Sequence, residues 1–158
     1  MRILPYLFTA LLGITGCTTA QQPADSYRMT SAAERAVTSL QTITISQGDA
    51  VEAIVSGIYL NAVYPRRYRD GEYFLIALYD ALGQGLLGTL KLNGVVAPLA
   101  VEPLAEEDPL LSLMPIRNAW YRYYLLQFPL QPAARELTLT PGSGRTVKGA
   151  LNYRKDGR

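Results

Sequence analysis

Short segments with a β-strand pattern recur along most of this chain and constrain its fold more than any other feature. In each segment, apolar residues alternate with polar ones, or β-branched and aromatic residues predominate, as in strands that bury one or both faces. The expected strands lie within residues 42–46, 53–63, 72–80, 88–102 (two strands), 118–128, 136–140 and 145–154. Seven or eight short strands without intervening long helices predict a mainly β chain forming one β-sandwich, immunoglobulin-like or transthyretin-like. The alternative is an α+β sheet with one packed helix.

Two of these segments carry more detailed expectations. Asn93-Gly94 favours a tight hairpin turn within 88–102, because both residues tolerate positive φ. The segment 118–128 reads as one long strand whose alternation places Trp120 on the core face. Tyr121 and Tyr123 then lie on the opposite face, where exposed aromatic rings suit contact with a protein or a sugar. A ladder of aromatic residues that merely stabilises the sheet is the alternative.

Two short helices are expected beside the strands. Ser31 and Glu34 have the spacing of a capping box, which predicts a helix over about 32–40. Asp108-Pro109 places an N-cap residue before a proline at the first helical position and predicts one or two helical turns before Pro115.

The residue types present exclude several classes of chemistry. The chain has one cysteine, no histidine and a formal net charge of +2. A second cysteine for an internal disulfide, a Ser-His triad and an ordinary zinc site are therefore absent, and the charge does not favour nucleic acid. Residues 83–88 match the glycine pattern of dinucleotide sites, but the alternation that follows predicts a loop and a strand instead of the required helix. We expect no enzyme activity, catalytic residue, metal or cofactor.

The N-terminus has the features of a secretory signal peptide. Arg2 precedes an apolar stretch over residues 3–12, which is too short to span a bilayer, and small residues follow. The segment Ile14-Thr15-Gly16-Cys17 resembles the lipobox of bacterial lipoproteins. This resemblance implies that Ile14, Thr15 and Gly16 are read by the processing machinery. It also implies that Cys17 is diacylated on sulfur and becomes the mature N-terminus.

The same resemblance implies a location in the Gram-negative envelope. Thr18, instead of Asp, follows the cysteine, which in such lipoproteins indicates passage to the outer membrane. We expect a signal peptide over 1–16, a lipidated flexible tether over 17–30, and a β-sandwich domain over 31–158 with a charged C-terminal tail. The domain is expected to face the periplasm, held by its lipid anchor, and to contact an envelope protein.

One segment stands out as a candidate binding surface. Residues 64–73 contain Arg66, Arg67 and Arg69 interleaved with tyrosines, among them Tyr68. Guanidinium groups in such a cluster can bind phosphate or carboxylate groups in bidentate fashion. A solvated loop turning at Asp70-Gly71 is the simpler interpretation. We therefore expect a non-catalytic binding or assembly module. A lipoprotein that recognises lipopolysaccharide or peptidoglycan through this loop is the alternative.

Overall fold

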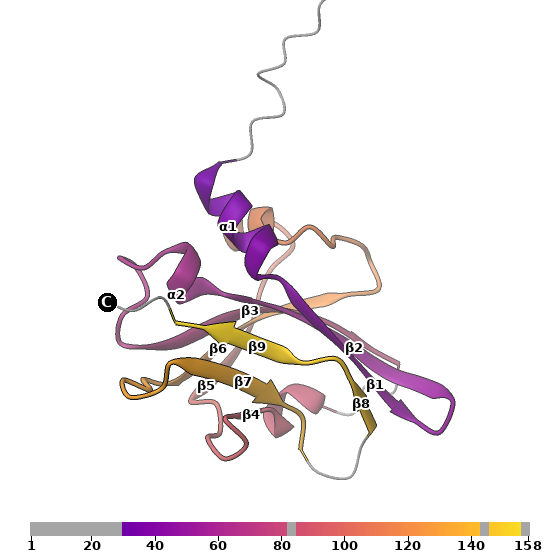
Figure 1. Ribbon diagram of the computed structural model, residues 1–158. Helices are drawn as coiled ribbons and strands as arrows, with labels where there is room; N and C mark the ends of the chain where they lie inside the picture. The colour runs from indigo at the N-terminus through magenta and orange to yellow at the C-terminus, as the bar shows by residue number, and fades with distance from the viewer. Residues whose placement is uncertain (1–29, 82–84, 143–145, 156–158) are drawn as a thin grey trace, which may run out of the picture.

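The computed structural model describes residues 30–81, 85–142 and 146–155. Within these residues, nine strands form two antiparallel sheets that pack face to face (Figure 1). The six-stranded sheet has the order β5-β6-β3-β2-β1-β8, and the three-stranded sheet has the order β4-β7-β9. The strands are β1 Gln41–Gln47, β2 Ala50–Tyr59, β3 Gly71–Asp80, β4 Lys91–Leu92, β5 Ala100–Pro103, β6 Arg122–Pro129, β7 Glu136–Thr140, β8 Thr146–Lys148 and β9 Leu151–Arg154. The expected mainly β sandwich with short helices is confirmed.

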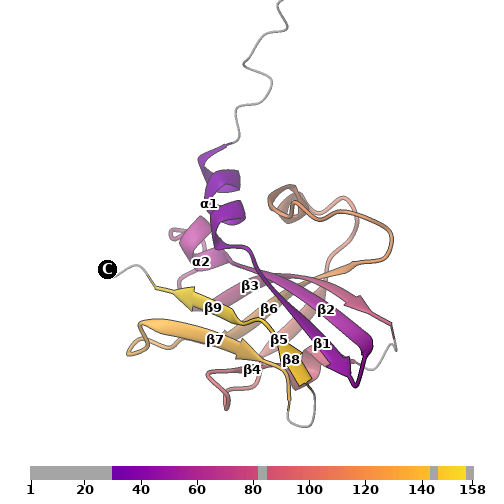
Figure 2. The same ribbon diagram turned by 45° about the vertical axis from the view of Figure 1, so that its right-hand side comes forward.

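Short helices cover the other face of the larger sheet. They are α1 Ser31–Ser39, α2 Leu60–Val63 and the 3-10 helix η3 Pro109–Leu113, and a further 3-10 helix, η2 Leu86–Thr89, lies before β4. In Figure 2, α1 and the segment containing η3 lie on one side of the six-stranded sheet, and β4, β7 and β9 lie on the other. No helix in the described residues is long and apolar enough to cross a membrane.

The central strand β3 is buried on both faces and separates two hydrophobic cores. Phe74 and Ile76 point into the core between the sheets, where Phe128 packs edge-on to Phe74 at a ring distance of 5.7 Å. Leu75 and Ala77 point into the second core, beneath the helices. Full burial of an aliphatic or aromatic side chain contributes about 1.5–3 kcal/mol. This two-sided burial explains why β3 is apolar over consecutive residues.

The two expected helix starts are found with one correction. Thr30, not Ser31, caps α1, since its hydroxyl accepts a hydrogen bond from the Ala33 N–H at 3.2 Å. Asp108 caps η3 as expected, accepting from the Leu110 N–H at 2.8 Å. The apolar side of α1 places Ala36 in the second core.

Several strand boundaries differ from the expectation. The segment 53–63 is not a single strand, because the chain turns into α2 after β2. The Asn93-Gly94 turn forms, with φ of 51° and 76°, but the two flanking strands do not pair along their length. Instead β4 joins β7 and β5 joins β6, so that the expected hairpin is divided between the two sheets.

The last expected strand is also divided. Gly149, with φ of 92°, separates β8 in the larger sheet from β9 in the smaller one. A Cβ at this position would lie 2.8 Å from the Thr42 carbonyl oxygen, so both the backbone conformation and the close approach require glycine. In the glycine-rich segment 83–88, the described part begins at Gly85 and continues into the four-residue η2, not into a long helix.

Candidate ligand-binding groove

A buried asparagine in α2 shapes the arginine-rich loop. The Asn61 side-chain N–H groups donate to the carbonyl oxygens of Tyr68, at 3.2 Å, and Gly71, at 2.7 Å. The Asn61 carbonyl oxygen accepts from the Tyr73 N–H at 2.8 Å. All three bonds cross the base of residues 64–71, so one side chain holds the loop in place between α2 and β3.

The loop presents its arginines to solvent and buries its tyrosine. Arg66, Arg67 and Arg69 are exposed, whereas Tyr68 is only 6% exposed and packs in the second core. The Arg67 guanidinium lies 5.3 Å from the centre of the Tyr68 ring, a cation–π distance. Burial raises the pKa of the Tyr68 hydroxyl, and the Arg67 charge opposes that rise in part. The structure therefore leaves the arginines available for binding and assigns Tyr68 to packing.

The aromatic residues near β6 lie elsewhere. Tyr121 and Tyr123 are half-buried against the second core, and the Tyr123 hydroxyl donates to the Ile116 carbonyl at 2.9 Å. The prediction that Trp120 belongs to the core is wrong, because this side chain is 77% exposed. The reason is local: β6 begins only at Arg122, so the strand alternation does not extend back to residue 120. These tyrosines and the arginine loop line different cavities.

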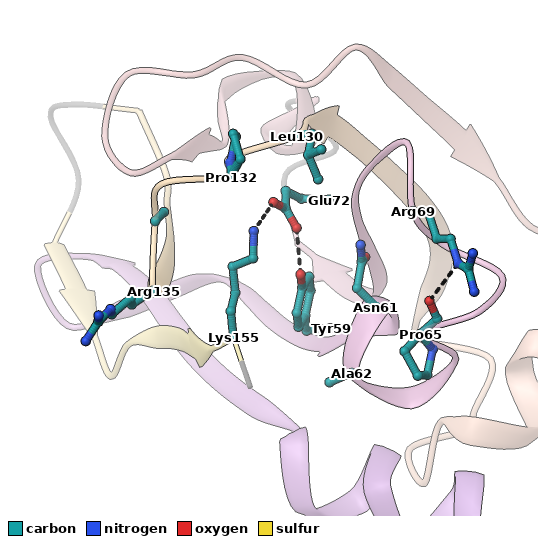
Figure 3. A pocket seen from close by; sticks show the side chains of 11 residues that line it. Tyr59, Asn61, Ala62, Pro65, Arg69, Glu72, Leu130, Pro132, Arg135 and Lys155 are labelled. Atoms are coloured by element: carbon teal, nitrogen blue, oxygen red, sulfur yellow. Dashed lines mark hydrogen bonds and ion pairs between the residues drawn. The ribbon is translucent and has the colours of Figure 1, made fainter. Parts of the chain in front are cut away.

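A groove of about 550 Å³ adjoins the arginine loop, and Arg69 is the loop arginine that reaches it. Figure 3 shows that its side chains come from distant parts of the chain. The groove is lined by Tyr59, Asn61, Ala62, Pro65, Arg69, Glu72, Leu130, Pro132, Ala134, Arg135 and Lys155. The volume is within the range typical of small-molecule sites.

A fully buried carboxylate lies at the base of this groove. Glu72, which is 0% exposed, accepts from the Tyr59 hydroxyl at 2.6 Å and from the Gln131 N–H at 2.8 Å. Its third donor is the Lys155 ammonium group at 2.7 Å, an ion pair that joins residues 83 positions apart. Three charge-assisted hydrogen bonds offset the large cost of burying a carboxylate.

Lys155 has a structural role that the sequence did not indicate. We expected residues 154–158 to form a charged tail, yet Arg154 belongs to β9 and the Lys155 side chain is only 21% exposed. Besides Glu72, its ammonium group binds the Gln131 carbonyl at 2.8 Å. A charged residue at the start of an apolar strand was a signal for Glu72. No comparable signal marked Lys155 or Arg135, because the groove brings them together with Tyr59 and Glu72, which are distant from both in the sequence.

The groove has a surplus of positive charge. Arg69, Arg135 and Lys155 oppose the single carboxylate of Glu72. Among the described residues, no group of three or more acidic, histidine or cysteine side chains could hold a metal ion. The residues in the groove can therefore bind and orient a ligand by charge and hydrogen bonding.

The predicted lipidation site falls outside the described residues. Cys17 and the preceding Ile14, Thr15 and Gly16 all lie in the segment 1–29. The first described helix, α1, begins at Ser31.

Comparison with known proteins does not place the chain in a family. No protein-family model, curated protein or solved structure matches it.

Proposed function

We propose that this protein is a lipid-anchored, non-catalytic binding or assembly module of the Gram-negative cell envelope. The lipobox-like sequence ending at Cys17 supports the anchor, and Thr18 supports an outer-membrane location with the domain facing the periplasm. A single acyl chain holds a protein on a membrane only marginally, whereas two or more chains, as a bacterial lipoprotein carries on its cysteine, anchor it stably.

One observation carries the non-catalytic part of this proposal. Glu72 is the single buried carboxylate among the described residues, and it accepts hydrogen bonds from three groups of the protein itself. A general acid or base must come within hydrogen-bond reach of a substrate proton, whereas the Glu72 side chain is 0% exposed. Glu72 is instead used to tie β2, β3, the loop after β6 and the end of β9 together. The groove above it is then suited to binding.

The anchor is tested by substitution of the cysteine. In cells supplied with a labelled fatty acid, the wild-type chain should incorporate the label and lose residues 1–16. Cys17→Ser should accumulate as an unlabelled precursor, and Thr18→Ser serves as the matched control that keeps the cysteine. A Cys17→Ser protein that is processed normally would show that the segment is not a lipobox.

The binding role is tested by crosslinking in intact cells. A photoreactive residue in place of exposed Arg135 or Arg69 should capture an envelope component. The same residue in place of Val51, exposed on β2 outside the groove, serves as the control. Equal capture from all three positions, or capture from none, would argue against the groove as the binding surface.

A second candidate function is recognition of lipopolysaccharide or peptidoglycan by the arginine loop. The exposure of Arg66, Arg67 and Arg69 on one short loop favours it. No ion pair joins any of the three to another described residue. Replacing all three with glutamate should abolish retention of the protein on immobilised lipopolysaccharide or peptidoglycan. Retention that survives this charge reversal would exclude the loop as the recognition surface.

A further inference from the structure

The hydrogen-bonding capacity of the groove is unequally distributed between donors and acceptors. An ammonium group has three N–H donors, and Lys155 uses two of them, on Glu72 and on the Gln131 carbonyl. A guanidinium group has five donors, and Arg69 uses one, from Nε to the Pro65 carbonyl at 3.4 Å. The Arg135 guanidinium makes no hydrogen bond or ion pair to any described residue. Many donors are therefore left for a ligand.

The acceptor side is already occupied. Both oxygens of Glu72 accept hydrogen bonds from the protein. The Asn61 amide uses its two donors and its carbonyl oxygen on the backbone of the neighbouring loop. The remaining lone pairs of these oxygens are shielded, since Glu72 is 0% and Asn61 9% exposed. The polar side chains of the groove thus offer mainly N–H groups and positive charge. A cation or a neutral hydrogen-bond donor finds little to bind there.

The groove is elongated, and its charges are spaced along it. Figure 3 shows Arg135 and Arg69 at opposite ends, with Lys155, Glu72 and Tyr59 between them. The walls between the charges are apolar, formed by Ala62, Pro65, Leu130, Pro132 and Ala134. Leu130 is 45% exposed, so apolar surface is available to a ligand and not only to the core.

From this arrangement we propose that the groove binds an elongated ligand that carries an oxyanion group on an apolar body. Carboxylates and phosphates accept hydrogen bonds without donating any, and they pair with guanidinium groups in bidentate fashion. The apolar body lies along the proline- and leucine-lined wall. This inference rests on the proposed function as a binding module and specifies the chemical class of its ligand.

The test uses four small probes that share one apolar chain. The acylated, ¹⁵N-labelled protein in a nonionic detergent is titrated with hexyl phosphate, hexanoate, hexanol and hexylamine, and its amide chemical shifts are recorded. Hexyl phosphate or hexanoate should shift the amides of Gln131 and its groove neighbours in a saturable manner. Hexanol and hexylamine should bind about tenfold more weakly or not at all, since a lost charge-assisted hydrogen bond costs about that factor.

The tighter of the two anions identifies the source of the natural ligand. A preference for hexyl phosphate indicates a phosphorylated lipid or sugar, and a preference for hexanoate indicates a carboxylate such as that of a peptide.

A pair of double variants with equal charge change locates the site. Arg69→Gln with Arg135→Gln removes both groove arginines and should weaken binding of the preferred anion about tenfold or more. Arg117→Gln with Arg122→Gln removes two exposed arginines that lie outside both the arginine loop and the groove, and should change binding less than twofold. All four side chains are exposed, so both variants should fold, which their amide spectra will show.

Three results would overturn the inference. These are equal losses in both double variants, equal binding of hexanol, and the absence of saturable shifts up to the solubility limit of the anions. None of them would affect acyl labelling at Cys17 or crosslinking to an envelope partner. Conversely, a chain that is not lipidated could still bind the anions, so that the two proposals fail separately.

Discussion

Replacing Lys155 with methionine should destabilise the protein far more than its position near the C-terminus suggests. The substitution keeps an unbranched side chain of similar length but removes the ammonium group. Glu72, which is 0% exposed, then keeps its Tyr59 and Gln131 hydrogen bonds and loses its only ion-pair partner among the described residues. The Gln131 carbonyl loses a donor as well.

The size of the effect follows from the burial of the two partners. Removing one partner of a fully buried ion pair costs about 3–5 kcal/mol, because a charge is left unpaired in a poorly solvated site. The Lys155 side chain is 21% exposed, so water reaches one side of this pair and screens it. We therefore expect Lys155→Met to lower the free energy of unfolding by about 2–3 kcal/mol.

The measurement is urea unfolding at pH 7, with linear extrapolation of the free energy to water. Arg135→Met is the matched control, since it removes one positive charge from the same groove without touching Glu72. Because Arg135 is exposed, this variant should stay within about 0.5 kcal/mol of the wild type. In a Glu72→Gln background no buried charge exists, and Lys155→Met should then cost only about 1 kcal/mol.

Two results would refute this reasoning. If Lys155→Met costs no more than Arg135→Met, the lysine does not compensate the buried carboxylate. If Lys155→Met costs the same in the wild type and in the Glu72→Gln background, the effect arises from lost packing and not from the unpaired charge.

Further predictions follow from single contacts. Tyr153→Phe should raise the free energy of unfolding by about 1 kcal/mol, since this buried hydroxyl has no partner among the described residues. Burial raises the pKa of the Tyr153 hydroxyl in the folded protein. The same hydroxyl ionises at lower pH in the unfolded chain, so the free energy of unfolding of the wild type should fall above about pH 10. In urea unfolding at increasing pH, Tyr153→Phe should lose less stability than the wild type. Gly57→Ala should cost about 1–3 kcal/mol, and less in the Tyr153→Phe background, because its Cβ would lie 2.5 Å from the Tyr153 hydroxyl oxygen. Asn61→Ala should lower the free energy of unfolding by about 3 kcal/mol, because the backbone groups that its buried side chain binds lose their partners. Trp120→Ala should change thermal stability little, because this side chain is exposed.

The strands with clear alternation were predictable because their local pattern agrees with their burial. Residues 136–140 were expected as a strand and form β7 with the same bounds, with Leu137 and Leu139 buried and their neighbours outside. The segment 118–128 was less predictable. Its aromatic residues fit a strand equally well on either side of Arg122, and only pairing with β3 determines where β6 begins.

Turn chemistry predicted local geometry but not strand partners. Asn93 and Gly94 adopt the positive φ values that the sequence indicates. However, the hydrogen bonds of Asn93 go to Thr138 of β7, at 2.7 Å through its N–H and at 3.0 Å through its side chain. A turn fixes the direction of the chain over a few residues, whereas the choice of partner strand depends on which sheet edge is available.

By itself the sequence determined the strand-rich class, the helix caps within one residue and the resemblance of residues 14–17 to a lipobox, because each depends on residues close together in the chain. Only the tertiary structure decided which charges meet. Glu72 and Lys155 are 83 positions apart. They become partners because the chain passes from the larger to the smaller sheet at Gly149, and Lys155, just after β9, then reaches Glu72 of β3 in the other sheet. The groove, its surplus of donors and the burial of Tyr68 all depend on such long-range packing, which no local pattern in the sequence records.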